Sequence, residues 1–491
     1  MTTPGKPVEV EVAVLGAGFS GICAAIQLKR RGIRSFVVLE KSAGVGGTWR
    51  ENTYPGAECD IPSHIYSYSF ALKPDWTKHY AAGPEIRDYI QSCVTEYGLA
   101  DNLRLNTLVT RAVWSDGRWE IATAEGDVYR ARAVISGLGG LHTPNFPALD
   151  GVESFGGKSF HTSRWDHSAD LRGLRIGMIG TGATAVQAAP ALAEAASDFY
   201  LFQRTPSWVG PKRDPVYSDE QRTEFADNPE VLRRHRWELW RHWESTGQDL
   251  FTAGTRLNQI IETAAYGNIQ NNVNDPVLVE KLTPRYNITC KRPTISDKYY
   301  PIFNQSNVHL VTDTIERVTA RGLILLNGQG HMVDIPLDVI VYATGFKPFD
   351  ITTEIEVVGL GGLNLADAWS GGITSYRTVA VHGFPNFFLL MGPNTSGLNS
   401  ALQMIEAGSK YAVSAIELSS ADRVALHPRR AAVDQFTERI AEMSRFTTAN
   451  KGCTSWWTAG GTNHALWPSS SVSYRLMLSA PDLSDFDLVE A

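Results

Sequence analysis

Two glycine-rich segments hold the residues whose spacing most directly indicates chemistry. The first runs Gly16-Ala17-Gly18-Phe19-Ser20-Gly21, and the second runs Gly180-Thr181-Gly182-Ala183-Thr184-Ala185. Both match G-x-G-x-x-G/A, in which small residues allow a tight turn and a close approach of the backbone to a pyrophosphate at a helix N-terminus. Because such glycines recur by chance in a chain that has 43 of them, the elements around each motif must decide whether it binds a dinucleotide.

The elements around both motifs are expected in the order strand, helix, strand. Apolar and β-branched runs predict the strands, and apolar residues at helical spacing predict the helices. The first unit is expected over strand 10–15, helix 21–31 and strand 36–39, and the second over strand 174–179, helix 180–195 and strand 199–202. The sequence therefore predicts an α/β fold with two Rossmann-like dinucleotide-binding domains.

One position distinguishes the two units. Glu40 ends the second strand of the first unit, about 20 residues beyond the glycines, where a carboxylate accepts hydrogen bonds from ribose hydroxyls. The matching residue of the second unit is Arg204, whose guanidinium can pair with a 2′-phosphate that a carboxylate would repel. The contrast assigns NADPH to the second unit and leaves the first for FAD. On spacing alone, either residue could instead be an exposed strand end.

The domain boundaries follow from the same pattern. The strand over 339–343 is interpreted as a return to the first sheet, which makes the first domain discontinuous. We expect an FAD-binding domain over 1–142 and 337–491, a linker over 143–147, and an NADPH-binding domain over 148–336 with a helical insertion at about 215–283.

The composition argues against nucleic acid as a partner. The formal net charge is −7, so no basic excess is available to neutralise a phosphate backbone. Trp237, Trp240 and Trp243 stand among arginines in the insertion. Their spacing is more typical of a helix face packed on a core, with the arginines pointing outward, than of a basic aromatic surface for nucleic acid.

The five cysteines are scattered without C-x-x-C spacing. The sequence therefore predicts neither a zinc site nor a dithiol redox motif, and no metal is expected. The N-terminus has no charged-then-apolar leader, and no run of about 18 apolar residues follows. These features favour a cytoplasmic enzyme that neither crosses nor enters a membrane.

Two further segments carry a family resemblance. Between the units, Phe155, Gly157, His161 and Trp165 fill the pattern F-x-G-x-x-x-H-x-x-x-W, which resembles the fingerprint of type I Baeyer-Villiger monooxygenases. The stretch 46–60 is similar to the second signature of these enzymes, [AG]-G-x-W-x4-[FY]-P-[GM]-x3-D, with every fixed position filled. The resemblance extends over nearly the whole chain.

The resemblance implies a reaction and the residues that perform it. The family reduces FAD with NADPH, forms a C4a-peroxyflavin with O2, and inserts one oxygen atom next to a ketone carbonyl to give an ester or lactone. A nucleophilic peroxide must stay deprotonated, and the family assigns its stabilisation to an arginine that matches Arg292. Asp60 matches the carboxylate that orients this guanidinium. From the residues alone, a helix or turn cap is the favoured interpretation of Asp60.

Further cofactor contacts are implied by matching positions. Lys291 and Thr205 match residues that share the 2′-phosphate with Arg204. The positions that match flavin contacts are Gly47, Thr48, Trp49, Tyr66 and Val109, and Trp456 matches an indole near the nicotinamide. Single aromatic residues are most often core residues, so these assignments depend on the resemblance.

The fingerprint histidine is interpreted as part of a hinge rather than as a base. His161 could titrate near neutral pH, but it lies in a connector between the two units. The same flavin must meet nicotinamide first and substrate later, which requires movement. One departure from the family concerns Leu398, where relatives commonly have histidine, and no role is assigned to it.

Three other readings remain open. A flavin-containing monooxygenase that oxygenates nitrogen or sulfur has the same folds and cofactors, but usually has Tyr or Phe where Trp165 stands. A disulfide reductase needs paired cysteines beside the flavin, and none are predicted. A nucleotide-binding protein without turnover would keep both glycine motifs. The sequence does not disclose which ketone (or thioether) is the substrate, or the oligomeric state.

Overall fold

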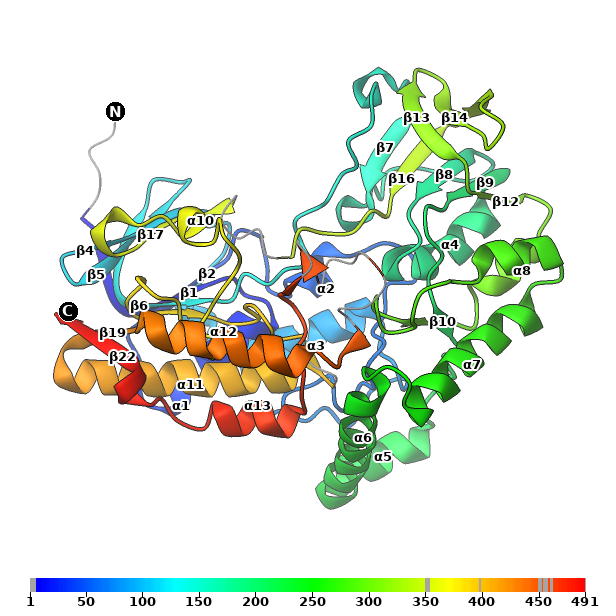
Figure 1. Ribbon diagram of the computed structural model, residues 1–491. Coiled ribbons are helices and arrows are strands. Elements are labelled where there is room, and N and C mark those ends of the chain that lie inside the picture. The colour runs from blue at the N-terminus through cyan, green and yellow to red at the C-terminus, as the bar shows by residue number, and fades with distance from the viewer. Residues whose placement is uncertain are drawn as a thin grey trace.

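The computed structural model describes residues 6–348, 354–396, 399–448, 453, 458–459 and 462–490. The chain forms two lobes, each built on its own main sheet (Figure 1). Within the described ranges, no helix has the length and apolar character needed to cross a membrane. The structure confirms the predicted α/β class with two Rossmann-like units.

The first lobe contains an eight-stranded sheet in the order β17-β4-β5-β6-β1-β2-β3, with β18 also paired to β6. β1 runs parallel to its neighbours β2 and β6, while β5 pairs antiparallel with β4 and β6. The strands are β1 (Val8–Leu15), β2 (Phe36–Leu39), β3 (Leu103–Arg104), β4 (Val109–Ser115), β5 (Arg118–Thr123), β6 (Val128–Ser136), β17 (Glu356–Val358) and β18 (Phe387–Leu389).

Both faces of this sheet are covered. Val12 and Val14 of β1 pack against the core under α1 and α11, whereas Ala13 and Leu15 join a second core on the opposite face. This alternation follows from the two-residue period of a strand. The helices of this lobe are α1 (Phe19–Arg30), α2 (Thr48–Glu51), α3 (Gly83–Glu96), α10 (Leu365–Ala368), α11 (Ala401–Asp422), α12 (Arg430–Ser444) and α13 (Ser471–Met477), and β19 (Val424–Pro428) pairs with β22 (Phe486–Glu490).

The second lobe contains a five-stranded parallel sheet in the order β12-β9-β8-β16-β7. Helix α4 follows β8 and packs on the core of this lobe, as the glycine motif predicts. The elements are β7 (Lys158–His161), β8 (Arg175–Ile179), α4 (Ala183–Ala195), β9 (Asp198–Phe202), β12 (Val308–Val311) and β16 (Val339–Tyr342), with an antiparallel sheet of β13 (Thr314–Thr319), β14 (Gly322–Leu326) and β15 (Met332–Pro336) beside them.

The expected return of strand 339–343 to the first sheet is wrong. Val339–Tyr342 form β16, which lies between β8 and β7 in the second sheet. All four residues are buried, and a fully apolar strand fits the interior of either parallel sheet equally well. The second lobe therefore extends through Tyr342, and β17 and β18 are the later strands that join the first sheet.

The helical insertion forms where it is expected, and one detail differs. It contains α5 (Asp219–Asp227), α6 (Pro229–Leu250), α7 (Arg256–Asn272) and α8 (Pro276–Leu282). Trp240 and Trp243 pack on the core of the first lobe, but Trp237 is 51% exposed and lies beside Arg241. Arg236 points inward instead of outward and donates to the Ser67 carbonyl over 3.1 Å, because α6 docks on the loop that follows Asp60.

Candidate active site

The first glycine loop and the second signature segment touch each other. Gly16 follows β1, and Gly21 lies in the first turn of α1. Gly47 has a φ of +51°, and a Cβ atom added there would lie 2.9 Å from the Cα atom of Gly18. Only glycine permits this approach, so the two segments form one surface at the N-terminus of α1, where a pyrophosphate fits.

Glu40 supports this loop from the end of β2. It is 6% exposed, and its two carboxylate oxygens accept the backbone N–H groups of Ala17 and Ser42 over 2.7 and 2.8 Å. The acid that the sequence assigns to ribose therefore also fixes the turn of the glycine loop.

The second glycine loop has a comparable shape. Gly180 has a φ of +117°, and a Cβ atom there would collide with the carbonyl oxygen of Ala343 at the end of β16. A Cβ atom at Gly182 would meet nothing within 4 Å, so the face of the loop is open to a phosphate. Ala185 is fully buried against the sheet, and Thr181 donates to the Thr205 carbonyl over 2.7 Å.

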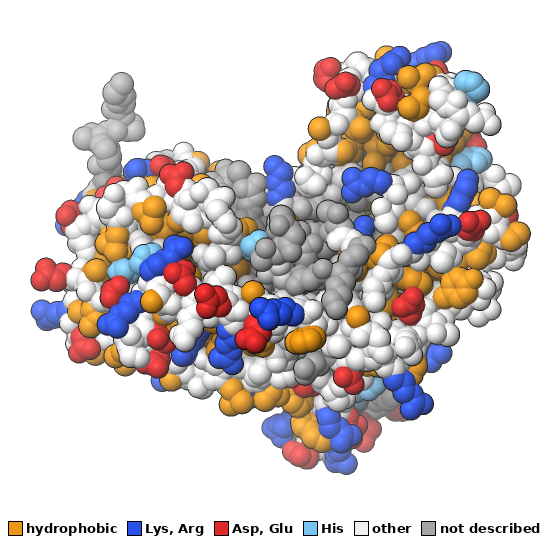
Figure 2. All heavy atoms as spheres, viewed as in Figure 1, with side chains coloured by type: hydrophobic (Ala, Val, Ile, Leu, Met, Phe, Trp, Pro, Cys, Tyr) orange, Lys and Arg blue, Asp and Glu red, His pale blue; other side chains and the backbone are white. Residues whose placement is uncertain are grey.

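A cavity of about 960 Å³ brings together the three predicted 2′-phosphate contacts, Arg204, Thr205 and Lys291. Basic side chains gather on the face of the second lobe near α8 (Figure 2). Burial lowers the pKa of Lys291, and the charge of Arg204 lowers it further. Two cations held this close favour an anion between them. The cavity is also lined by Pro206, Val277, Glu280, Lys281, Thr283, Arg285, Tyr286 and Cys453.

Arg292 and Asp60 form a two-pronged ion pair, as the resemblance predicts. The Nη2 and Nε atoms of Arg292 donate to the two carboxylate oxygens of Asp60 over 2.6 and 3.2 Å. The charge of Asp60 raises the pKa of Arg292. The arginine side chain remains 46% exposed, so the pair fixes the edge with Nε and Nη2, and among the described residues the other edge is left open to a ligand.

The predicted flavin contacts lie in two places. Trp49 donates its Nε1 hydrogen to the Tyr66 hydroxyl over 3.2 Å, and the charges of Asp60 and Arg292 reach that hydroxyl. Thr48 begins α2 beside Gly47. Val109 starts β4 and is 5% exposed in the core of the first sheet. Trp456 and Leu398 lie outside the described residues.

The fingerprint residues lie around β7. His161 is 1% exposed, and burial lowers its pKa to about 4, so its ring is neutral at pH 7. Its Nδ1 atom accepts the backbone N–H of Ser163 over 3.1 Å. Trp165 packs edge-on against Phe160, and Phe155 packs on the core beneath β13 and β14. A Cβ atom at Gly157 would collide with the Asp338 carbonyl.

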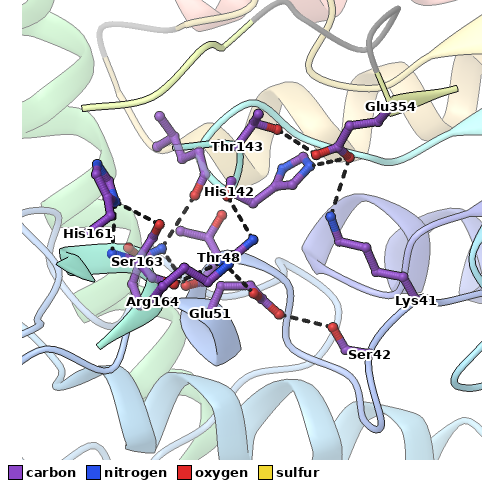
Figure 3. A network of polar contacts seen from close by, with 12 residues as sticks. Lys41, Ser42, Thr48, Glu51, His142, Thr143, His161, Ser163, Arg164 and Glu354 are labelled. Atoms are coloured by element: carbon purple, nitrogen blue, oxygen red, sulfur yellow. Dashed lines mark hydrogen bonds and ion pairs between the residues drawn. The ribbon is translucent and has the colours of Figure 1, made fainter. Parts of the chain in front are cut away.

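A polar network joins the two lobes beside this segment (Figure 3). Arg164, next to Trp165, donates to Glu51 of α2 over 2.9 Å, and Glu51 also accepts the Ser42 hydroxyl over 2.9 Å. A second Nη atom of Arg164 donates to the His142 carbonyl over 3.4 Å. One arginine of the second lobe therefore contacts α2 and the residue directly before the expected linker.

Glu354 lies at the opposite end of this network from Arg164 and contacts His142, Thr143 and Lys41 (Figure 3). It accepts hydrogen bonds from His142 and Thr143 over 3.0 and 2.7 Å, and Lys41 pairs with it over 3.3 Å. The bond from His142, the bond from Thr143 and the charges of His142 and Lys41 outweigh burial and lower the pKa of Glu354 to about 2.

Comparison with known proteins decides the family. A family model described as pyridine nucleotide-disulphide oxidoreductase matches residues 13–225. A Baeyer-Villiger monooxygenase of Pseudomonas aeruginosa is 38% identical over 99% of this chain and 93% of its own length. The chain belongs to the Baeyer-Villiger monooxygenase family. The predicted family resemblance is therefore confirmed.

Two solved structures have the same fold over nearly the whole chain. The closed crystal structure of cyclohexanone monooxygenase matches 99% of this chain and 100% of its own, with a TM-score of 0.87 and 29% identity. The complex of OTEMO with FAD and NADP matches the same shares, with a TM-score of 0.88 and 28% identity.

Sequence reasoning missed several groups in this Baeyer-Villiger monooxygenase. Cys290 and Cys453 form a disulfide bond across 163 residues, which the scattered cysteine spacing did not predict. Glu58, two residues before Asp60, forms ion pairs with Lys78 and Lys212. No short motif marks these partners, because each pair joins segments that are distant in sequence. The only feature of the sequence that linked Cys290 to the site was its position directly before Lys291.

Proposed function

We propose that this Baeyer-Villiger monooxygenase uses NADPH, FAD and O2 to insert one oxygen atom next to the carbonyl of a ketone, and that Arg292 and Asp60 hold the reacting groups. The observation that carries the proposal is the two-pronged pair between these residues, with a free guanidinium edge. The cytoplasm is the proposed location, since the enzyme consumes NADPH.

The residues of the first lobe suit FAD. The open surface at Gly18 and Gly47 would receive the pyrophosphate, Glu40 the ribose, and Trp49 and Tyr66 the region nearest the Arg292–Asp60 pair. FAD bound here and reduced by NADPH supplies the activation of oxygen. The protein's contribution is to place that chemistry next to a fixed cation.

The residues of the second lobe suit NADPH. The open face at Gly182 would receive the pyrophosphate, and the cavity with Arg204, Thr205 and Lys291 would receive the 2′-phosphate. A carboxylate at the position of Arg204 would favour NADH instead. Lys291 and Arg292 are neighbours in sequence, so the phosphate contact and the reaction cation are carried by one short segment.

Arg292 would stabilise negative charge on oxygen during the insertion. A guanidinium does not lose its proton at working pH, so it can donate without acting as an acid. Donors that are already positioned stabilise developing charge more effectively than water does. Asp60 would hold the guanidinium in this position. By keeping the attacking oxygen anionic, the pair favours nucleophilic attack on a carbonyl over electrophilic transfer to nitrogen or sulfur.

The test is product analysis with a cyclic ketone and a thioether side by side. We expect the holoenzyme to give a lactone from the ketone. Arg292→Ala should lose lactone formation by about 100-fold or more, the usual effect of removing one donor to a reacting oxyanion, while retaining FAD. Arg317→Ala, an exposed arginine of β13, is the matched control.

Two outcomes would contradict the proposal. Full lactone formation by Arg292→Ala would remove the arginine from the reaction. Sulfoxide from the thioether with no lactone from the ketone would identify a heteroatom monooxygenase, in which the reacting oxygen is electrophilic.

A further inference from the structure

The disulfide between Cys290 and Cys453 lies at the NADPH cavity. Cys290 is fully buried and directly precedes Lys291, whereas Cys453 is partly exposed and lines the cavity with Arg204 and Lys291. The bond therefore fixes one wall of the cavity to the segment that carries a proposed phosphate contact.

The chain up to Thr448 is held in place independently of this bond. The hydroxyls of Thr448 and Thr289 hydrogen bond to each other, and both residues are fully buried. The Thr448 backbone N–H also donates to the Phe251 carbonyl over 2.9 Å. Because these bonds fix Thr448 to Thr289 and to Phe251 of the helical insertion, cleavage of the disulfide would release Cys453 without detaching the chain that ends at Thr448.

The surroundings of Cys453 suit thiol–disulfide exchange. The cavity wall carries Arg204, Lys281, Arg285 and Lys291 against one carboxylate, Glu280, which already pairs with Arg285 over 3.0 Å. Cations beside a partly exposed sulfur favour the thiolate, which is both the attacking and the leaving form. Cys23, Cys59 and Cys93 are buried free thiols, so Cys453 offers the accessible sulfur among the described cysteines.

We propose that the Cys290–Cys453 disulfide is a thiol–disulfide exchange site at which a dithiol reductant lowers the affinity of the cavity for NADPH. A thiolate of the dithiol attacks the Cys453 sulfur, the protein S–S bond breaks, and Cys290 leaves with the electron pair. The second thiol of the reductant then displaces Cys453 and closes its own disulfide. Two electrons pass to the protein, which gains two thiols.

The direction of the effect follows from the geometry. The bond holds Cys453 against Cys290, so reduction frees Cys453 and removes a fixed wall from the cavity beside Lys291. In a reducing compartment, disulfides are usually transient and redox-sensing, which fits a reversible switch. The inference rests on the proposed assignment of this cavity to NADPH.

The first measurement counts thiols in the holoenzyme. Alkylation after denaturation should label three cysteines in the oxidised protein and five after dithiothreitol. Saturating NADP⁺ should shift the thiol–disulfide equilibrium toward the disulfide. The size of this shift should equal the factor by which reduction weakens NADP⁺ binding, because coupling between two equilibria is reciprocal. Five alkylated cysteines in air-oxidised protein would overturn the proposal.

The second measurement is the dissociation constant of NADP⁺ in the oxidised and reduced holoenzyme. We expect reduction to raise it about fivefold or more, the lower range of ordinary coupling between sites. Cys453→Ser should bind NADP⁺ like the reduced wild type and ignore dithiothreitol. Cys93→Ala, which removes a free thiol, should keep the response. Equal affinities in all four forms would overturn the proposal.

NADP⁺ binding by Arg204→Ala distinguishes failure of the redox proposal from failure of the assignment of the cavity to NADPH. If Arg204→Ala weakens NADP⁺ binding while reduction does not, the cavity holds the nucleotide and the switch is wrong. If Arg204→Ala leaves NADP⁺ binding unchanged, the cavity assignment itself is wrong.

Discussion

Arg204 and Glu40 follow the second strands of two similar units, and their opposite charges carry the cofactor assignment. Arg204→Ala should raise the KM for NADPH by about tenfold, since a charge-assisted hydrogen bond contributes about 1.5 kcal/mol or more and this side chain is exposed. The KM for NADH should stay within about twofold, because NADH lacks the 2′-phosphate. Steady-state kinetics with both nucleotides measures the contrast.

The control for this prediction is Arg317→Ala, which removes an exposed arginine far from the cavity in sequence. An equal rise in KM for NADPH and NADH would show that Arg204 contacts a part common to both nucleotides, and the assignment of the 2′-phosphate would fail.

At this scale, the offset from the glycines selects Arg204 and Glu40 because Rossmann units repeat their geometry. Their contacts with nucleotides stay predictions. Glu40 also accepts a hydrogen bond from the Ala17 N–H. The sequence could not predict this bond, because whether a carboxylate binds the backbone or a ligand depends on the conformation of the nearby turn. Asp60 illustrates the opposite limit. From the residues alone a turn cap is the favoured reading. The fold adds the ion pair with Arg292, which no pattern around Asp60 marks, and the role of Asp60 in the reaction stays a proposal.

Among the elements, α2 and the short helix that contains Arg164 face each other across the lobes. Their ion pair is partly exposed, with 46% and 21% of the side-chain surface accessible, so it contributes about 1 kcal/mol or less to stability. We expect the ion pair to affect mainly how the two lobes are arranged relative to each other. This arrangement must change between flavin reduction and oxygen insertion.

Arg164→Ala should therefore retain FAD and thermal stability while lowering the ratio of product formed to NADPH oxidised. A change of about 0.5 kcal/mol in the balance between two arrangements alters their ratio about twofold, and we expect a loss of at least this size. Measurement of product, NADPH and hydrogen peroxide gives the ratio.

The double variant Glu51→Arg/Arg164→Glu restores the pair with reversed charges and should recover part of the ratio. An unchanged ratio in Arg164→Ala, or no recovery in the swap, would show that the pair does not affect the arrangement of the lobes.

Periodicity around the two glycine motifs predicted β1, α1, β2, β8, α4 and β9. It failed for β16, whose four apolar residues have no exposed face to show which sheet they join. The path of the chain decides which strands a fully buried strand pairs with. The local sequence of such a strand is compatible with either sheet.

For the whole molecule, three histidines join the helical insertion to the first lobe. His64 of the first lobe contacts His235 of α6 edge-on at 4.9 Å between ring centroids, and the Tyr217 hydroxyl lies 3.4 Å from His79. Burial lowers the pKa of all three imidazoles, that of His64 to about 3. Their neighbours Arg236 and Lys73 add to the effect on His64. This docking contact therefore requires neutral rings.

The sign of the pH dependence follows from these shifts. Between about pH 6.5 and the lower folded values, the unfolded chain binds more protons than the folded chain, so stability is fully present above pH 6.5 and falls as the pH drops. Each such proton changes stability by about 1.4 kcal/mol per pH unit. Carboxylates titrate mostly below this window, so pH 6.5 to 5 isolates the histidines.

We expect the midpoint of thermal unfolding to fall from pH 6.5 to pH 5, and His64→Phe, which keeps a ring of similar size, to reduce that fall. His242→Gln, at an exposed position of α6, should retain the wild-type dependence. Differential scanning calorimetry across this range measures both. If His64→Phe and the wild type lose stability in parallel, protonation of this cluster does not govern the docking of the insertion. The acid sensitivity would then have to arise in the lobes themselves.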